Sequence, residues 1–186
     1  MHELKVVAPA FPADVKGLLA AAVRDPDPVL FFEQKSLYPM KGEVPDGEYV
    51  DQLGKARVLR SGKDCTIVAL ASMVHKAMDA AAALEKEHGI ACTVIDLRSL
   101  VPLDTQTILG EVGKTGRLFT VEENPRLCGW GAEIVSIVAE ECFWNLDAPI
   151  VRITTPHVPL PSADLLEDNT IPSVARIVRE IREKMG

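Results

Sequence analysis

The stretch CTIVALASMVHKAMDAAAALEKEHGIACTVIDL, residues 65–97, decides the fold. Its opening run Cys65–Leu70 is almost entirely apolar, which is typical of a strand buried on both faces of a sheet. From Ser72, a potential N-terminal cap, a helical pattern runs to Gly89. The apolar residues of that pattern fall on one face: Val74, Ala77, Met78, Ala81 and Leu84. A second β-rich run, Ala91–Leu97, follows, so the stretch predicts a βαβ unit of a parallel sheet.

The same alternation continues on both sides of this unit. Residues 56–60 form a candidate edge strand, and Asp104 is placed to cap a helix over 105–112. Further elements are predicted as a strand at 118–121, a helix from 129–131 to 142, a strand at 150–153 and a final amphipathic helix from 172. We therefore predict an α/β domain over residues 47–186, with three layers and helices on both faces of a mostly parallel sheet.

The preceding residues 1–46 predict a smaller α/β piece. A strand is expected at 4–8, a helix at 14–24 and a second strand at 28–33. Prolines and glycines among charged residues over 35–51 indicate an exposed linker. Because one βαβ unit is too small to cover both faces of a sheet, we interpret residues 1–46 as the last unit of a second α/β domain plus a linker.

Composition excludes several classes of protein. The chain has 186 residues, a hydrophobic fraction of 47% and a net charge of −7, which argues against a nucleic-acid partner because phosphate binding needs clustered Lys and Arg. No apolar run is long enough to span a bilayer, and the first residues lack a secretory leader pattern. We therefore predict a cytoplasmic protein without a membrane partner. The four cysteines form no Cys-x-x-Cys pair, which favours buried free thiols over zinc or a disulfide framework.

Polar residues at the carboxyl ends of predicted strands are candidates for a site, because open α/β sheets bind ligands there. His75 lies in the first turn after one strand, where a ligand contact and a surface or interface position are both open. Glu122 and Glu123 end another strand, and two carboxylates could act as acid and base or bind a metal. Alternatively, one of them pairs with Arg126 or Arg98.

The segment from Asn124 to Glu133 follows a strand and opens a helix. Free amide groups at a helix start could hold an anion, but the segment lacks the third glycine of a dinucleotide fingerprint. Its glycines fit a tight turn and close helix packing instead. Since the chain also lacks a phosphate loop and a nucleophile elbow, we predict no catalytic and no cofactor-binding residue in it.

Short motifs along the whole chain resemble one family, although each is weak alone. They are LKVVAP (4–9), DVKGLL (14–19), RDPDPV (24–29), LGKA (53–56), DLRSL (96–100), PLDT (102–105), GAEI (131–134), LDAP (146–149) and IPS (171–173). In this order they resemble the C-terminal part of the β subunit of thiamine-diphosphate-dependent 2-oxo acid dehydrogenases, including a transketolase C-terminal-like domain. TPHVPLP at 155–161 looks more like the acetoin-cleaving branch, with the pyruvate branch nearly as close.

The resemblance implies an oxidoreductase, the decarboxylating component of a 2-oxo acid (pyruvate) or acetoin dehydrogenase multienzyme complex. It implies thiamine diphosphate with magnesium in the parent enzyme, an α subunit and a second β subunit as partners, and docking to a dihydrolipoyl acyltransferase core. The family's activating glutamate and active-site histidine come from a segment that has no counterpart here. We therefore expect this chain alone to be inactive and to act in assembly and docking. A pure assembly module and a stand-alone small-molecule enzyme are the alternatives.

The turn after the first predicted helix is a candidate cation site. Carbonyls at a helix end carry partial negative charge, and Asp25 and Asp27 lie beside them. A turn stiffened by its prolines, without an ion, would have the same sequence. The family resemblance implies a potassium site here, formed by the carbonyls of Ala22 and Val23 with Asp25 and Asp27.

Overall fold

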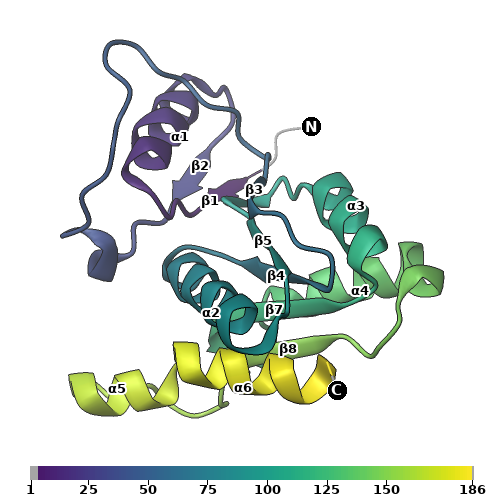
Figure 1. Ribbon diagram of the computed structural model, residues 1–186. Helices are drawn as coiled ribbons and strands as arrows, with labels where there is room; N and C mark the ends of the chain where they lie inside the picture. The colour runs from purple at the N-terminus through teal and green to yellow at the C-terminus, as the bar shows by residue number, and fades with distance from the viewer. Residues whose placement is uncertain (1–3, 186) are drawn as a thin grey trace.

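The computed structural model describes residues 4–185 and contains two sheets (Figure 1). The larger sheet has five strands in the order β3-β5-β4-β7-β8. All neighbours in it are parallel except the edge strand β3, which is antiparallel to β5. The strands are β3 (Arg57–Arg60), β4 (Cys65–Ala69), β5 (Cys92–Asp96), β7 (Leu118–Pro125) and β8 (Val151–Thr155). The mostly parallel sheet predicted from sequence is thus confirmed.

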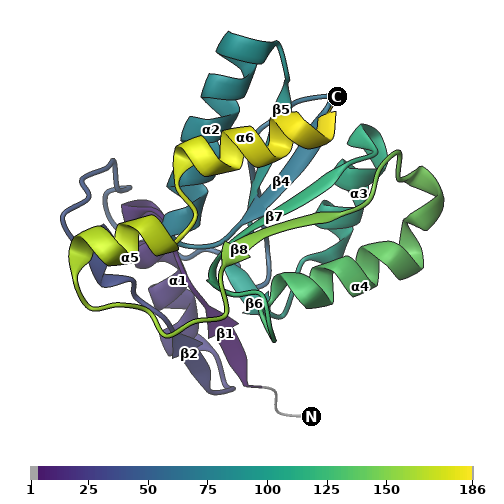
Figure 2. The ribbon, with the colours of Figure 1, turned by 90° about the horizontal axis from the view of Figure 1, so that it is seen from below.

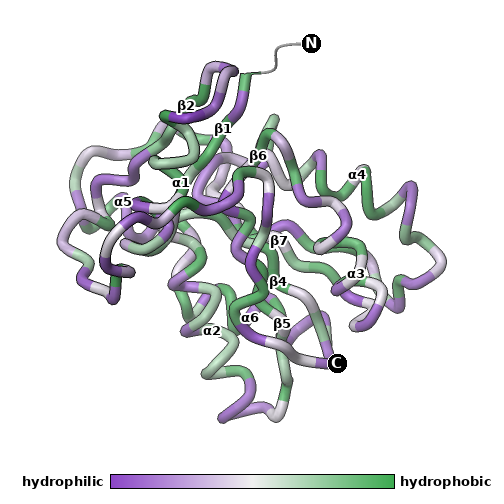
Figure 3. Tube along the Cα trace, turned by 90° about the horizontal axis from the view of Figure 1, so that it is seen from above, coloured by the Kyte–Doolittle hydropathy of each residue, from purple (hydrophilic) through white to green (hydrophobic). Residues whose placement is uncertain are grey.

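Helices cover both faces of this sheet (Figure 2). On one face, α2 (Ser72–His88) and α6 (Val174–Met185) pack on an apolar cluster that includes Ile67, Val94 and Ile181. On the other face, α3 (Thr105–Thr115) and α4 (Gly131–Glu141) pack on a second cluster. Because β4 and β5 are buried at every residue between these layers, their sequences are mostly apolar and show no alternation of apolar and exposed polar residues. The hydrophobic residues accordingly gather along the central strands (Figure 3).

The N-terminal unit consists of β1 (Lys5–Val7), α1 (Pro12–Arg24) and β2 (Val29–Phe31), with β1 and β2 parallel as predicted. A third strand, β6 (Ser99–Val101), joins β1 antiparallel and gives the order β2-β1-β6. This strand was not predicted. It comes from the larger domain, so the two units share a sheet, and the division near residue 46 stays a prediction.

Two helix ends show how local sequence sets the boundaries. Asp104 accepts a hydrogen bond from the backbone N–H of Thr107 at 3.3 Å, which confirms it as the N-cap of α3. The prediction that Ser72 caps α2 is wrong, because Ala71 holds the N-cap position with φ of 50° and no side-chain cap. Gly89 ends α2 in the left-handed conformation that favours glycine.

The remaining elements are short. The segment 35–51, expected as a linker, contains one 3-10 turn, η1 (Lys35–Leu37), and η2 (Phe143–Asn145) follows α4. A seven-residue helix, α5 (Asp164–Thr170), which was not predicted from the sequence, lies before α6 and reaches out beyond it (Figure 1). Among residues 4–185, no helix is long and apolar enough to cross a membrane.

Candidate functional site

The carboxyl ends of β4 and β7 meet side chains of the N-terminal unit. Glu123 accepts hydrogen bonds from Nε2 of Gln34 and from the hydroxyl of Ser72, each at 2.6 Å. The backbone N–H of Ser72 in turn donates to Oε1 of Gln34 at 3.0 Å. The three residues come from the segment after β2, the start of α2 and the end of β7. The hydroxyl that sequence suggested as a helix cap therefore contributes to a contact between the two units.

His75 makes the same kind of contact one turn further along α2. Its Nε2 lies 2.8 Å from the carbonyl oxygen of Ala10, in the loop before α1. Its ring meets the ring of Phe11 edge-on, with centroids 4.8 Å apart. Of the two readings open from sequence, the structure places His75 at an interface between the units.

Glu122 is fully buried and all of its bonding partners belong to the chain itself. Its two oxygens accept bonds from Nε and Nη2 of Arg152 at 2.9 and 3.0 Å, so this arginine, and not Arg126 or Arg98, is its ion-pair partner. Thr120 and Asn124 donate at 2.8 and 3.1 Å. Burial raises the pKa of Glu122, but these donors outweigh it and hold the pKa below its ordinary value. Glu122 is thus a fixed anion, not an acid–base group.

The start of α4 shows why its glycines are needed. The backbone N–H of Gly131 donates to Oε2 of Glu122 at 3.0 Å, so the anion at this helix start is a protein carboxylate. A Cβ added at Gly129 or Gly131 would collide with the Glu122 side chain. Close packing, the second alternative drawn from the sequence, is what these glycines permit.

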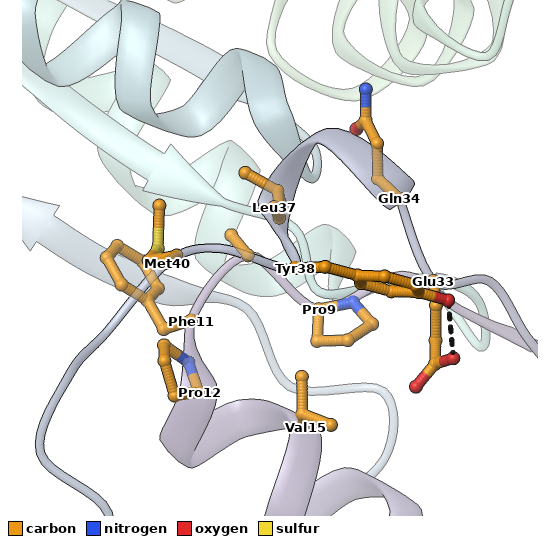
Figure 4. A pocket seen from close by; sticks show the side chains of 10 residues that line it. Pro9, Phe11, Pro12, Val15, Glu33, Gln34, Leu37, Tyr38 and Met40 are labelled. Atoms are coloured by element: carbon orange, nitrogen blue, oxygen red, sulfur yellow. Dashed lines mark hydrogen bonds between the residues drawn. The ribbon is translucent and has the colours of Figure 1, made fainter.

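A cavity of about 260 Å³ lies beside the Gln34 contact (Figure 4). Its apolar wall comes from the loop before α1, from η1 and from the turn after η1, and includes Phe11, Leu37 and Met40. At its rim the hydroxyl of Tyr38 donates to Glu33 at 3.1 Å. That bond raises the pKa of Tyr38. The cavity could not be predicted from sequence, since its two walls become neighbours only when residues 33–40 fold back over α1.

The predicted cation site contains a cation of the chain's own. The ammonium of Lys5 lies 2.6 Å from both carboxylate oxygens of Asp25 and 3.6 Å from Oδ2 of Asp27. The hydrogen bond with Asp25 raises the pKa of Lys5, and the same bond lowers that of Asp25. The carbonyl of Ala22 accepts the N–H of Asp25 at 3.3 Å, whereas Val23 is 78% exposed. Potassium coordination by these four residues therefore stays a prediction.

Within residues 4–185, no group of three or more His, Cys, Asp and Glu side chains is arranged to hold a metal ion. All four cysteines are free. Three of them are buried as expected, but Cys128 is exposed, so the prediction of buried thiols is wrong for that residue. Cys65 and Cys92 start neighbouring strands with their sulfurs 3.4 Å apart. Their hydrogen bond and their burial raise the pKa of Cys65, which keeps it an unreactive thiol.

Comparison with known proteins gives a consistent result. Residues 54–177 match the family model of the transketolase C-terminal domain. The chain is 47% identical to the β subunit of acetoin:2,6-dichlorophenolindophenol oxidoreductase of Cupriavidus necator, covering 98% of this chain and 54% of that protein. It is 49% identical to subunit beta-2 of the mitochondrial pyruvate dehydrogenase E1 component of Oryza sativa, covering 95% and 48%.

The structural comparison agrees. A solved structure described as a split-gene transketolase in an inactive β4 tetramer superposes with a TM-score of 0.80 at 29% identity, covering 98% of this chain and 57% of that one. The curated relatives are similarly longer, because the chain spans about half the length of those it matches.

Proposed function

We infer the function of this chain from its family, because the chain belongs to the family of the transketolase C-terminal domain. We propose that it serves as the C-terminal part of the β subunit in the decarboxylating component of an acetoin or 2-oxo acid dehydrogenase complex. The observation that carries the proposal is the continuous match, over 98% of the chain, to β subunits of acetoin oxidoreductases. That match includes the N-terminal unit, not the family domain alone.

The role proposed for this part of the subunit is assembly. At the carboxyl edge of its larger sheet, Glu123 is bonded to Gln34 of the N-terminal unit and to Ser72, which supports a role in holding units together. Thiamine diphosphate with magnesium would supply the acyl-carrying chemistry in the assembled enzyme, with an α subunit and a second β subunit. A dihydrolipoyl acyltransferase core, to which the assembled enzyme would dock, is the third proposed partner. These partners, the potassium site and a cytoplasmic location remain proposals.

A chimera tests this function directly. The matching half of the acetoin oxidoreductase β subunit of Bacillus subtilis, 48% identical to this chain over 184 residues, can be replaced by residues 1–186. Together with its α subunit, the chimera is expected to reduce 2,6-dichlorophenolindophenol when acetoin is added. Failure of a folded chimera to bind the α subunit would contradict the proposal.

A second experiment separates the proposal from a stand-alone enzyme. The purified chain with thiamine diphosphate, magnesium and the dye should reduce none of it with acetoin or pyruvate, and calorimetry should detect no binding of thiamine diphosphate. Turnover that depends on this chain alone would favour the stand-alone alternative.

A further inference from the structure

Five charged side chains meet where α1 contacts the larger domain. They are Asp14 of α1, Asp51 of the segment before β3, Arg57 of β3, Asp96 at the end of β5, and Arg98 just after it. Arg57 Nη2 lies 2.7 Å from Oδ1 of Asp14, and Arg98 Nη2 lies 3.3 Å from the same atom. Arg98 also pairs with Asp51. The cluster is therefore a main polar contact between the two units.

The cluster has one more acid than base. Asp14 and Asp96 are completely buried and Arg98 is 4% exposed. Arginine keeps its charge at every relevant pH, so two guanidiniums face three carboxyls. With all three carboxyls ionised, the two guanidiniums would leave one negative charge uncompensated, and two of the carboxylates, Asp14 and Asp96, would be out of contact with water, which costs free energy.

Nearby titratable groups do not offset that charge. The hydroxyl of Tyr49 donates to Asp51 at 3.1 Å, and a phenol is neutral below pH 10. The ammonium of Lys55 lies 3.8 Å from Asp104, which takes up its charge. Neither group brings a positive charge to the two buried carboxyls.

Hydrogen bonding identifies which carboxyls are short of donors. Burial raises the pKa of Asp51, but the N–H of Gln52 and the charge of Arg98 together outweigh burial. The pKa of Asp51 therefore lies below its ordinary value, and Asp51 stays ionised. Among the described residues, by contrast, both oxygens of Asp14 and Oδ2 of Asp96 accept no hydrogen bond. Arg57 lies within ion-pair distance of Asp14 and lowers the pKa of its carboxyl, but its angle to Oδ1 falls short of a well-formed hydrogen bond.

Of the two buried carboxyls, Asp96 is more readily protonated than Asp14. Its Oδ1 accepts the backbone N–H of Arg98 at 3.1 Å, whereas Asp14 has both guanidiniums beside it. Burial raises the pKa of Asp96, and the negative charge of Asp14 raises it further, to about 7. Burial also raises the pKa of Asp14, against the pull of Arg98 and Arg57.

We propose that Asp14 and Asp96 together hold one proton in mild acid, and that the loss of this proton as the pH rises through neutrality loosens the contact between α1 and the larger domain. Two ionised carboxylates in this dry junction repel each other. The repulsion is relieved when water enters between Asp14, carried by α1, and Asp96, carried by the sheet. The pair therefore makes the union of the two units dependent on pH.

Carboxyl carbon resonances of the native chain test the proton directly. With 13C-labelled aspartate, one resonance of the buried pair should titrate with a midpoint near pH 7, about three units above an ordinary aspartate. Asp14→Asn should lower the midpoint of Asp96, whereas Asp79→Asn, on the exposed side of α2, should leave it unchanged. Ionisation of all three carboxyls of the cluster by pH 5 would overturn the proposal.

Hydrogen exchange of the α1 amides tests the structural consequence. After correction for chemical exchange, the opening equilibrium of α1 should increase by up to about tenfold per pH unit between pH 5 and the midpoint near 7. It should level off between the midpoint and pH 8.5, because neither the closed nor the open state then holds the proton. Asp96→Asn, which imitates the protonated form, should abolish that increase. If α1 stays equally protected over this range in the native chain, the proposed loosening is wrong; this result needs no variant to fold.

Discussion

Replacing Glu122 with glutamine should lower the free energy of unfolding by about 3–5 kcal/mol, the usual cost of breaking a buried ion pair from one side. Glu122 is fully buried and receives bonds from Thr120, Asn124, Gly131 and, twice, from Arg152. Glutamine keeps the shape, but its NH₂ group would face a donor and its neutral amide leaves the guanidinium of Arg152 without a counter-ion. The loss is a large part of a typical total of about 5–15 kcal/mol.

Urea denaturation followed by tryptophan fluorescence measures this loss. Glu133→Gln is the matched control, because it makes the same chemical change in the first turn of α4 at an exposed position. The control should stay within about 0.5 kcal/mol of the native chain. If Glu122→Gln also lies within that range, the network around Glu122 does not stabilise the domain and the argument is refuted.

The stability difference between the native chain and Glu122→Gln should depend on pH. The folded state holds the pKa of Glu122 below its ordinary value of 4.5, since the bonds from Arg152 and Gly131 outweigh burial. Stabilisation from a carboxyl of this kind is complete above its unfolded pKa and is lost as the pH falls through the lower, folded pKa. The stability difference between native chain and Glu122→Gln should therefore be full at pH 6–7 and shrink below about pH 4.5.

Three further outcomes are expected. If potassium binds at the turn containing Asp25, the melting temperature should be higher in potassium chloride than in tetramethylammonium chloride at equal ionic strength, and Asp25→Ala should remove the difference. Equal melting temperatures of the native chain in the two salts would mean that no potassium binds at this turn. Ile181→Ala should cost about 2–5 kcal/mol in urea denaturation because α6 buries this side chain completely, whereas the exposed Arg179→Ala should cost about 0.5 kcal/mol or less. Sedimentation should show a dimer or larger species, and Phe32→Lys, directly after β2 of the smaller sheet where Phe32 is 57% exposed, should shift it toward monomer.

The larger sheet could be predicted because its central strands are buried on both faces. Their apolar runs, and the one-sided pattern of α2 between them, are local features of the chain. The strand β6 could not be predicted in this way. It has only three residues, Ser99–Val101, and its partner β1 is more than ninety positions earlier, so the pairing that makes it a strand leaves no local pattern.

The candidate site was predicted in position but not in its contacts. Strand ends drew attention to Glu122 and Glu123, yet Arg126 or Arg98 was the expected partner of one of them. The actual partner, Arg152, lies on β8, whose register places it opposite Thr120 on β7. Which strand neighbours β7 is decided by the order of the sheet, and a strand's own sequence does not encode that order.

The position of these contacts bears on what the domain does. Open α/β sheets bind small molecules beyond the carboxyl ends of their strands, because loops and helix starts leave polar groups free there. In this chain, Glu123 and Ser72 are joined to Gln34, and His75 to the carbonyl of Ala10. Polar groups that would otherwise receive a ligand are thus used to attach the N-terminal unit. The edge that binds ligands in other open α/β sheets is here occupied by contacts between the N-terminal unit and the larger domain of the same chain.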